Sequence, residues 1–257
     1  MSEPTMVTRR SFLRGGVLLV CAAPGLASEG CASSDEPAAP GAPAASALPT
    51  KVGPWTVPAD TTLAPRHYAL LCAVADALLP GDDASPGAHL AGAAFYIDQL
   101  LGAFRVDPPR IFAGGPYSGR HGGEAGFASF QRLTRVEELR WRTAIEGSRG
   151  LPEREWNGPV VGLVERYPAG LDAIDASATS TFGESFLTLD LTRRQTILGG
   201  ADPDFVQLAY EHVVEGTWGD PVYGGNADML GWKAIRYEGD RQPIGFSARE
   251  MSNPEEG

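Results

Sequence analysis

The feature that most limits the fold of this chain is a helical periodicity of apolar residues that begins at Pro65. Proline is favoured in the first turn of a helix, and here it is followed by apolar residues at helical spacing: Leu70, Leu71, Val74 and Leu78. The Pro-Gly-Asp-Asp sequence at 80–83 then predicts a turn. The pattern therefore predicts a helix that starts at Pro65 and ends before this turn.

The same periodicity predicts helices over five further segments: 88–104, 134–148, 160–179, 190–198 and 202–217. In the first of these, one face would hold Leu90, Ala94, Ile97 and Leu101. Thr134 and Glu137 have the spacing of a capping box, and Asp190 is a favourable N-cap. Pro168 and Gly170 are expected to break or kink the segment that contains them. Strand-like alternation is hard to find, so the sequence predicts a mainly α fold.

We expect one irregular helical domain with a long Gly/Pro-rich loop, Arg105 to Phe127, and a structured C-terminal loop. The chain divides into an export segment at 1–31, a flexible Pro/Ala-rich linker at 32–60, and a helical domain at 61–257. Hydrophobic residues make up 43% of the 257 residues and charged residues 21%. This composition suits a folded domain after a disordered N-terminal segment.

The N-terminal segment matches the twin-arginine export signal. The matching residues are Arg9, Arg10, Phe12 and Leu13. The apolar run at 15–27 is too short to span a bilayer, which requires about 20 apolar residues. The sequence therefore predicts a cleaved Tat signal and a protein that reaches the periplasm or the outer face of the cytoplasmic membrane.

Two cysteines call for different interpretations. Cys31 lies just after the apolar run and is a candidate lipidation site, although Ser28 and Glu29 fit a lipobox poorly. Lipid anchoring at Cys31 and plain cleavage near Ala27 both remain open. Cys72 lies in an apolar stretch, and we expect it to be an inert buried thiol.

Several common functions lack support in the sequence. The formal net charge is -11, and no basic cluster follows Arg14, so nucleic acid is not an expected partner. No two glycines are separated by a single residue, which excludes the Gly-x-Gly-x-x-Gly dinucleotide fingerprint. Motifs for covalent haem, nucleotide phosphates, zinc and a serine nucleophile are also missing. We therefore expect no cofactor, metal or catalytic site in this chain.

One group of titratable residues leaves an enzymatic alternative open. Glu211, His212 and Glu215 fall within one helical turn, where an imidazole and carboxylates could act as a general base or hold a metal. A hydrogen-bonded structural histidine is the commoner outcome. Asp82 and Asp83 are likewise expected to serve the turn rather than bind a cation.

The most informative stretch follows the last predicted helix. It combines a Gly-Asp-Pro turn, glycines and an asparagine that tolerate positive φ, and large aromatic side chains. We treat the following residues as a candidate partner-docking motif: Trp218, Gly219, Asp220, Pro221, Tyr223, Gly224, Gly225, Asn226, Gly231 and Trp232. The aromatic residues could lock the C-terminal loop onto the helices, contact a partner protein, or do both.

These motifs resemble those of the gluconate 2-dehydrogenase subunit 3 family. The resemblance rests on the twin-arginine leader, the Leu-Pro-Gly-Asp-Asp sequence at 79–83, the Gly-Asp-Pro-x-Tyr-Gly-Gly-Asn block, and the Met-x-Gly-Trp-Lys sequence that follows. It covers most of the chain after residue 60. The chain departs from the family pattern at 236–239, where Arg236-Tyr237-Glu238-Gly239 replaces Gly-Tyr-Pro-Gly.

The resemblance implies a non-catalytic small subunit that accompanies an FAD-containing dehydrogenase of the glucose-methanol-choline type, acting on a sugar or a sugar acid such as gluconate. FAD would lie in that partner, and haem c in a multihaem cytochrome as a third subunit. The small subunit would carry the signal-less partner through the Tat translocase and support its folding and stability. A stand-alone envelope lipoprotein or binding protein is the alternative from another class.

Overall fold

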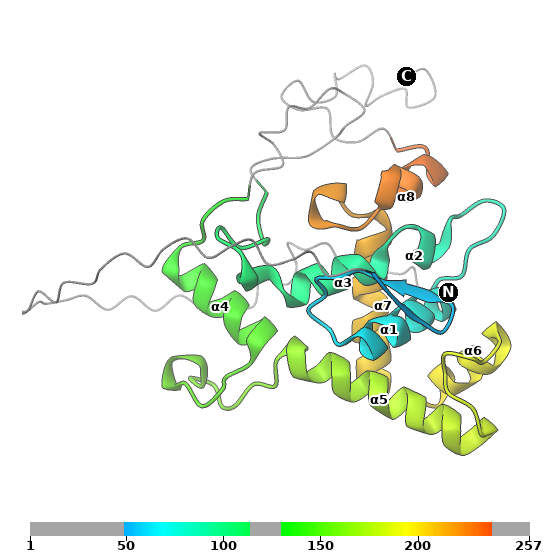
Figure 1. The fold of residues 1–257 in the computed structure, drawn as a ribbon. Helices are drawn as coiled ribbons and strands as arrows, with labels where there is room; N and C mark the ends of the chain where they lie inside the picture. Colours follow the sequence, from blue (N-terminus) through cyan, green and yellow to red (C-terminus); the bar gives the residue numbers. More distant parts are fainter. Residues whose placement is uncertain (1–48, 114–129, 238–257) are drawn as a thin grey trace, which may run out of the picture. The chain divides into compact units, whose positions relative to one another are not determined.

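The computed structural model of the chain describes residues 49–113 and 130–237 (Figure 1). These residues contain the strands β1 (Thr50–Val52) and β2 (Trp55–Val57) and the helices α1 (Pro65–Leu78), α2 (Gly87–Leu90), α3 (Ala93–Leu101), α4 (Arg135–Glu146), α5 (Leu163–Phe182), α6 (Leu191–Gly199), α7 (Pro203–Trp218) and α8 (Leu230–Ala234). Short 3-10 helices are η1 (Ala103–Arg105), η4 (Pro152–Arg154), η5 (Pro221–Tyr223) and η6 (Ala227–Met229). The prediction of a mainly α fold is confirmed.

Helix α1 is the centre of the core. It is apolar nearly all round, and such a helix is stable only when other elements cover it on every side. Helices α2, α3, α5, α6 and α7 and strand β2 all pack against it. Cys72 lies on this helix and is buried, which confirms the expected buried thiol. Burial raises the pKa of the Cys72 thiol to about 12, because the apolar surroundings disfavour the thiolate.

The helix expected over 88–104 is divided into α2, α3 and η1. The break falls at Gly92, whose φ of 76° lies in the left-handed region that favours glycine. Because the chain turns there, Leu90 is 63% exposed, so its predicted place on the buried face was wrong. Ala94, Ile97 and Leu101 are buried as expected.

Two predicted helix starts after α1 are confirmed, whereas the predicted interruptions and ends differ from the structure. Thr134 and Glu137 form the capping box, and the side chain of Asp190 accepts a hydrogen bond from the backbone N–H of Arg193. Helix α5 runs through Pro168 and Gly170 and stops at a left-handed Gly183, so the break expected at those two residues does not occur. Helix α4 ends at Glu146, two residues before the predicted end.

A short hairpin lies inside the stretch that the sequence predicted to be linker. β1 pairs antiparallel with β2, and Trp55 and Val57 of β2 are buried against the helices. Three-residue strands are too short to show alternation in the sequence, which is why periodicity missed them. The packed part of the chain therefore begins near Thr50, about ten residues before the predicted boundary.

A buried carboxylate fastens the segment after the hairpin to α3. The two oxygens of Asp98 accept hydrogen bonds from the backbone N–H of Thr62 at 3.0 and 2.9 Å, and Oδ1 accepts another from Leu63 at 2.8 Å. Burial raises the pKa of the Asp98 carboxyl, and the hydrogen bonds from Leu63 and Thr62 oppose this shift. Asp98 thus connects α3 with the chain that enters α1.

The long loop predicted from Arg105 to Phe127 is described as far as Ala113. Ala113 forms a β-bridge with Phe130, and the N–H of Gln131 donates to the carbonyl oxygen of Phe112 at 2.8 Å. The two ends of the loop therefore lie side by side. Residues 114–129 lie outside the described part of the chain, as do the export signal, Cys31 and residues 238–257.

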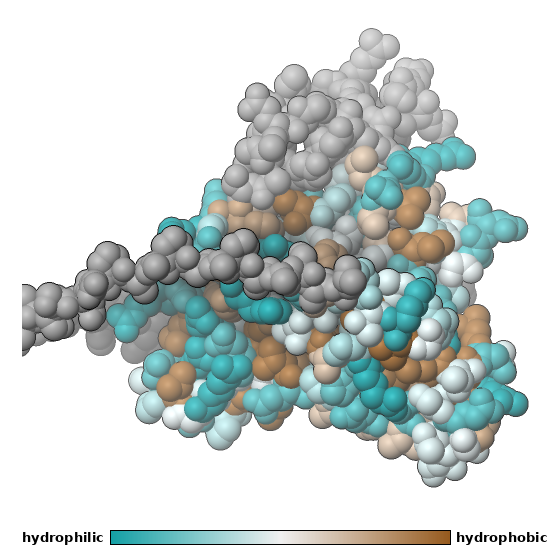
Figure 2. Space-filling view, in the orientation of Figure 1, coloured by the Kyte–Doolittle hydropathy of each residue, from teal (hydrophilic) through white to brown (hydrophobic). Residues whose placement is uncertain are grey.

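The surface is chemically mixed. On the face that Figure 2 shows, hydrophilic and hydrophobic residues are interspersed over the helices. None of the helices in the described ranges is both long and apolar enough to cross a membrane.

Candidate functional site

The C-terminal motif folds back onto the junction of α3 and α7. Helix α7 ends at Trp218, and Asp220 then caps η5 by accepting a hydrogen bond from the backbone N–H of Val222 at 3.0 Å. Gly224 follows with a φ of 96°, and Asn226 with a φ of 47°. The predicted positive-φ positions are thus confirmed at these two residues.

Asn226 holds the motif together. Its side chain is fully buried, its amide donates to the carbonyl oxygen of Gly219 at 2.9 Å, and its Oδ1 accepts from the N–H of Gly231 at 2.9 Å. Its backbone N–H donates to the carbonyl oxygen of Gly216 at 2.6 Å. One side chain therefore joins the end of α7 to the start of α8.

The two tryptophans of the motif are also bound to each other. The indole N–H of Trp232 donates to the carbonyl oxygen of Trp218 at 2.8 Å, and Trp232 is only 4% exposed. The Trp232 ring meets Tyr237 edge-on, with ring centroids 5.0 Å apart. Among the described residues, no hydrogen-bond partner faces the buried indole N–H of Trp218. Asn226 and Trp232 therefore serve the fold of the C-terminal loop.

The break between α2 and α3 accommodates the motif. The N–H of Ala227 donates to the carbonyl oxygen of Ala91 at 2.9 Å. Gly225 has no room for a side chain, because a Cβ there would overlap the carbonyl oxygen of Gly216. Gly216 in turn packs directly on Ala93 and Tyr96 of α3. The motif thus depends on close backbone contacts that glycine permits.

Tyr223 connects the motif with the ends of the long loop. Its hydroxyl group accepts a hydrogen bond from the backbone N–H of Ala113 at 3.1 Å. Its ring lies edge-on to Phe130, with centroids 5.8 Å apart. Two segments that the sequence analysis treated separately therefore meet at one residue. Trp218, Pro221 and Tyr223 are half-buried, so part of each side chain is accessible to a partner. A docking role for the motif stays a prediction, and these three residues are its candidates.

Glu211, His212 and Glu215 each contact a different residue. The Nδ1 atom of His212 lies 2.7 Å from the hydroxyl oxygen of Tyr167 on α5. Burial raises the pKa of Tyr167 well above its usual value, so the phenol keeps its proton, and the tautomer of His212 sets which of the two groups donates.

The two glutamates have separate neighbours. Glu215 accepts from the hydroxyl group of Tyr96 on α3 at 2.5 Å, whereas Glu211 accepts from Gln207 on its own helix at 3.0 Å. His212 and Glu215 are thus hydrogen-bonded to neighbouring helices, which matches the structural role that is commoner for such a histidine than catalysis. Within residues 49–113 and 130–237, no group of three or more His, Cys, Asp or Glu side chains could hold a metal ion.

The Asp82-Asp83 turn has a local role as well. The Oδ1 atom of Asp82 accepts hydrogen bonds from the backbone N–H groups of Ala84 at 2.8 Å and Ser85 at 2.7 Å. This is the pattern of an Asx turn, in which the side chain replaces a backbone acceptor. The expectation that Asp82 serves the turn is confirmed.

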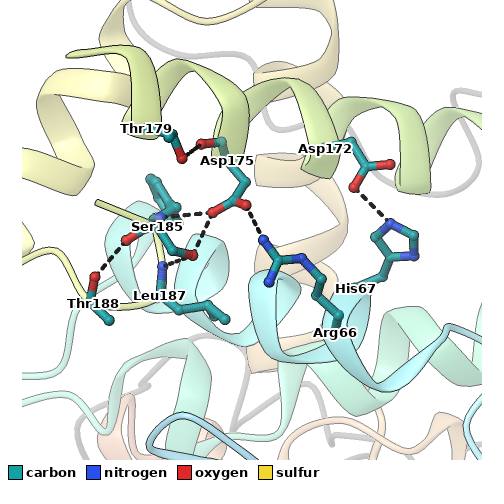
Figure 3. Close-up of polar contacts among 9 residues, drawn as sticks. Arg66, His67, Asp172, Asp175, Thr179, Ser185, Leu187 and Thr188 are labelled. Atoms are coloured by element: carbon teal, nitrogen blue, oxygen red, sulfur yellow. Dashed lines mark hydrogen bonds and ion pairs between the residues drawn. The ribbon is translucent and has the colours of Figure 1, made fainter. Parts of the chain in front are cut away.

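A polar network that sequence reasoning missed joins α1 to α5 (Figure 3). Asp175 of α5 is buried and forms an ion pair with Arg66 of α1. Its Oδ1 accepts from the hydroxyl group of Ser185 at 2.6 Å and from the backbone N–H of Phe186 at 2.8 Å. One signal could have found it, because Asp175 interrupts the buried face of α5 directly after Ile174.

A second contact lies beside this network. The Nε2 atom of His67 is 2.9 Å from Oδ1 of Asp172, one turn earlier on α5 (Figure 3). This pair is more exposed, with 63% of the Asp172 side chain open to solvent. Both contacts join α1 to α5.

The family model described as gluconate 2-dehydrogenase subunit 3 matches residues 65–239, well over half of the chain, including the C-terminal motif. No curated protein and no solved structure matches the chain. The family is a subunit of a gluconate 2-dehydrogenase complex, which implies an accessory role and a dehydrogenase partner. The chain belongs to the gluconate 2-dehydrogenase subunit 3 family.

Proposed function

We propose that this chain is the non-catalytic small subunit of an exported FAD-dependent dehydrogenase of the glucose-methanol-choline type, which oxidises a sugar or a sugar acid such as gluconate. FAD would reside in the large partner subunit, and haem c in a cytochrome subunit where the complex has one. The observation that carries the proposal is the C-terminal motif, which lies within the family match and is built as a rigid scaffold.

The hydrogen bonding of the motif supports a scaffold rather than a reaction centre. A catalytic group needs a proton or a lone pair free to meet a substrate. Asn226 and Trp232 instead direct their polar atoms at neighbours in the same chain. Such a module can present a fixed surface to a partner and stabilise it.

The export signal completes the proposal. A twin-arginine signal directs folded proteins across the membrane, so a small subunit that bears Arg9 and Arg10 could carry a flavoprotein that folds around FAD first. The complex would then act in the periplasm or at the outer face of the cytoplasmic membrane. Lipidation at Cys31 would hold it at the membrane, and cleavage near Ala27 would release it.

Co-expression with a glucose-methanol-choline flavoprotein encoded in the same genome tests the proposal. We expect the tagged full-length chain to retain that flavoprotein in equal amount, with the absorbance of bound flavin, and the isolated chain to oxidise no sugar substrate. Replacing Arg9 and Arg10 by lysine should leave both subunits in the cytoplasm, whereas the control Arg14→Lys should export both. A purified chain without flavoprotein, or with dehydrogenase activity of its own, contradicts the proposal.

A further inference from the structure

One loop places a large apolar side chain in solvent. Trp156 lies between α4 and α5 and is 91% exposed, more than any other large hydrophobic residue in the described chain. Leu151, Val160 and Val161 in the same loop are 37%, 40% and 61% exposed. A tryptophan buries the largest apolar area of any side chain when a partner covers it, and tryptophan is enriched among the residues that dominate protein interfaces.

The base of this loop is closed by its own hydrogen bonds. The N–H of Ser148 donates to the carbonyl oxygen of Val160 at 2.9 Å, and the N–H of Val160 donates to the Ser148 hydroxyl oxygen at 2.5 Å. The guanidinium of Arg154 donates to Glu146 at 2.9 Å and to the carbonyl oxygen of Gly147 at 3.2 Å. These bonds fix the backbone at the base of the loop before any partner arrives, which lowers the part of the entropy cost of binding that comes from ordering the loop.

A groove begins at the end of the same loop. Val161 lines it together with α5 and the junction between α6 and α7, and its volume is about 570 Å³. Its lining includes small residues on α5 and the larger Phe205: Ala169, Gly170, Ala173, Ser177 and Phe205. Phe205 fills the space over Gly170, whereas Ala169, Ala173 and Ser177 leave space along α5 for a segment of another protein. The exposed loop and the groove thus form one surface, which we call the Trp156 surface.

The charges around the Trp156 surface have an acidic excess. Arg154 is paired with Glu146 and is left out of the comparison. The remaining acidic residues of the loop and the groove are Glu153, Glu155, Glu165 and Asp202. The remaining basic residues are Arg149 and Arg166. In the part of the chain that the structure describes, no ion pair neutralises Glu153, Glu155 or Glu165. A complementary partner therefore offers an apolar pocket for an indole ring with lysine or arginine at its rim.

We propose that the Trp156 surface binds the large flavoprotein subunit, through an apolar pocket on that subunit that is rimmed by basic residues. This inference rests on the proposed function, because it assigns the interface of the same complex. Trp156 fills the pocket, the groove receives a neighbouring apolar segment, and the acidic rim accelerates the encounter.

The test uses the full-length chain and the purified flavoprotein that the co-expression experiment identifies, with affinity and rates measured by surface plasmon resonance. Trp156→Ala should weaken binding by about 30-fold or more, which is the range of an interface hot spot. Tyr210→Ala, which removes another exposed aromatic side chain, should bind like the wild type. Glu153→Lys should slow association several-fold and reduce its dependence on salt, whereas Asp60→Lys should not.

The outcomes separate this inference from the proposed function. If the wild-type chain does not bind the flavoprotein, the proposed function fails and the inference fails with it. If the wild type binds and Trp156→Ala binds equally well, the inference alone is overturned. A dimer of the isolated chain that Trp156→Ala dissociates would assign the surface to a second copy and also overturn the inference.

A further measurement determines whether another segment of the same chain covers Trp156. The fluorescence of Trp156 is the difference between the wild type and Trp156→Phe, and its quenching by acrylamide reports solvent access in the isolated chain. Fast quenching that slows when the flavoprotein binds supports the inference. Slow quenching in the isolated chain would show that another segment of this chain occupies the surface, which overturns the inference.

Discussion

The hydroxyl group of Tyr223 accepts a hydrogen bond from the backbone N–H of Ala113, which lies 110 residues earlier in the chain. This contact fastens the C-terminal motif to the start of the long loop. The ring of Tyr223 adds an edge-on contact with Phe130 at the other end of that loop. The motif thus closes the fold around two segments that share no local sequence signal.

Tyr223→Phe should separate the hydroxyl group from the ring. We expect the free energy of unfolding to fall by about 1 kcal/mol, because the Ala113 N–H loses an acceptor while the ring contact with Phe130 remains. Urea denaturation measures the change. Tyr210→Phe is the matched control, since Tyr210 is 43% exposed, and it should be neutral. Equal stabilities of the two variants would count against the contact.

Asn226→Ala should be more damaging. It removes the acceptor of the Gly231 N–H and the donor to the Gly219 carbonyl oxygen, both beside a fully buried side chain. Each unmet buried group costs about 1–3 kcal/mol, so we expect a loss of about 3 kcal/mol. Thermal and urea unfolding both report it. The exposed Asn157, changed to Ala, is the control, and a loss as small as the control's would contradict the prediction.

Asp175 and Arg66 allow charge and hydrogen bonding to be compared in one network. Arg66 is 57% exposed at its side chain, so Arg66→Ala should cost less than about 1 kcal/mol. Asp175→Ala should cost about 3 kcal/mol, because the Ser185 hydroxyl and the Phe186 N–H lose a buried acceptor. Asp175→Asn, which can keep that acceptor, should fall between them. The prediction fails if removing Arg66 costs as much as removing Asp175.

The sequence predicted those elements whose signals are local. Three helix starts could be predicted from four or fewer consecutive residues, and the structure confirms all three: Pro65 of α1, the Thr134 capping box and the Asp190 N-cap. The positive φ of Gly224 was also foreseen from residue type. These signals concern the backbone next to them, so they depend less on distant contacts, although the Pro168 signal was overridden inside α5.

The sequence could not predict features that depend on distant contacts. Periodicity gave one helix over 88–104, yet the chain turns at Gly92 because Ala227 and Gly224 pack there. The buried position of Asp175 depends on the separate segment at Ser185 and Phe186. Trp156 belongs to no recognisable sequence motif. Its exposure depends on how the loop between α4 and α5 folds, which the sequence does not indicate.

Cys72 should resist alkylation in the folded protein. With a pKa of about 12, only about one thiol in ten thousand is ionised at pH 8, against about one in ten for an ordinary thiol. Burial adds a steric barrier, because the residue is 3% exposed. Iodoacetamide labelling with peptide mapping should therefore find Cys72 unmodified until denaturant is added. At pH 9 the thiolate fraction of Cys72 would still be only about one in a thousand, so labelling should stay slow there too, and rapid native labelling would refute the assignment.

Gly225→Ala tests whether close backbone contact holds the motif on α7. A Cβ at this position overlaps the carbonyl oxygen of Gly216, and α7 cannot move away, since Gly216 already rests on Ala93 of α3. We expect a loss of about 3 kcal/mol or a failure to fold, because overpacking of this kind displaces backbone rather than a flexible side chain.

Gly199→Ala is the matched control for that substitution. A Cβ at Gly199 meets no atom within 4 Å, and alanine suits a helix better than glycine. The control should be neutral or gain up to about 0.5 kcal/mol in urea unfolding. If Gly225→Ala folded as well as Gly199→Ala, the C-terminal motif would have to be free to move off α7, and a rigid scaffold could not be its contribution to the complex.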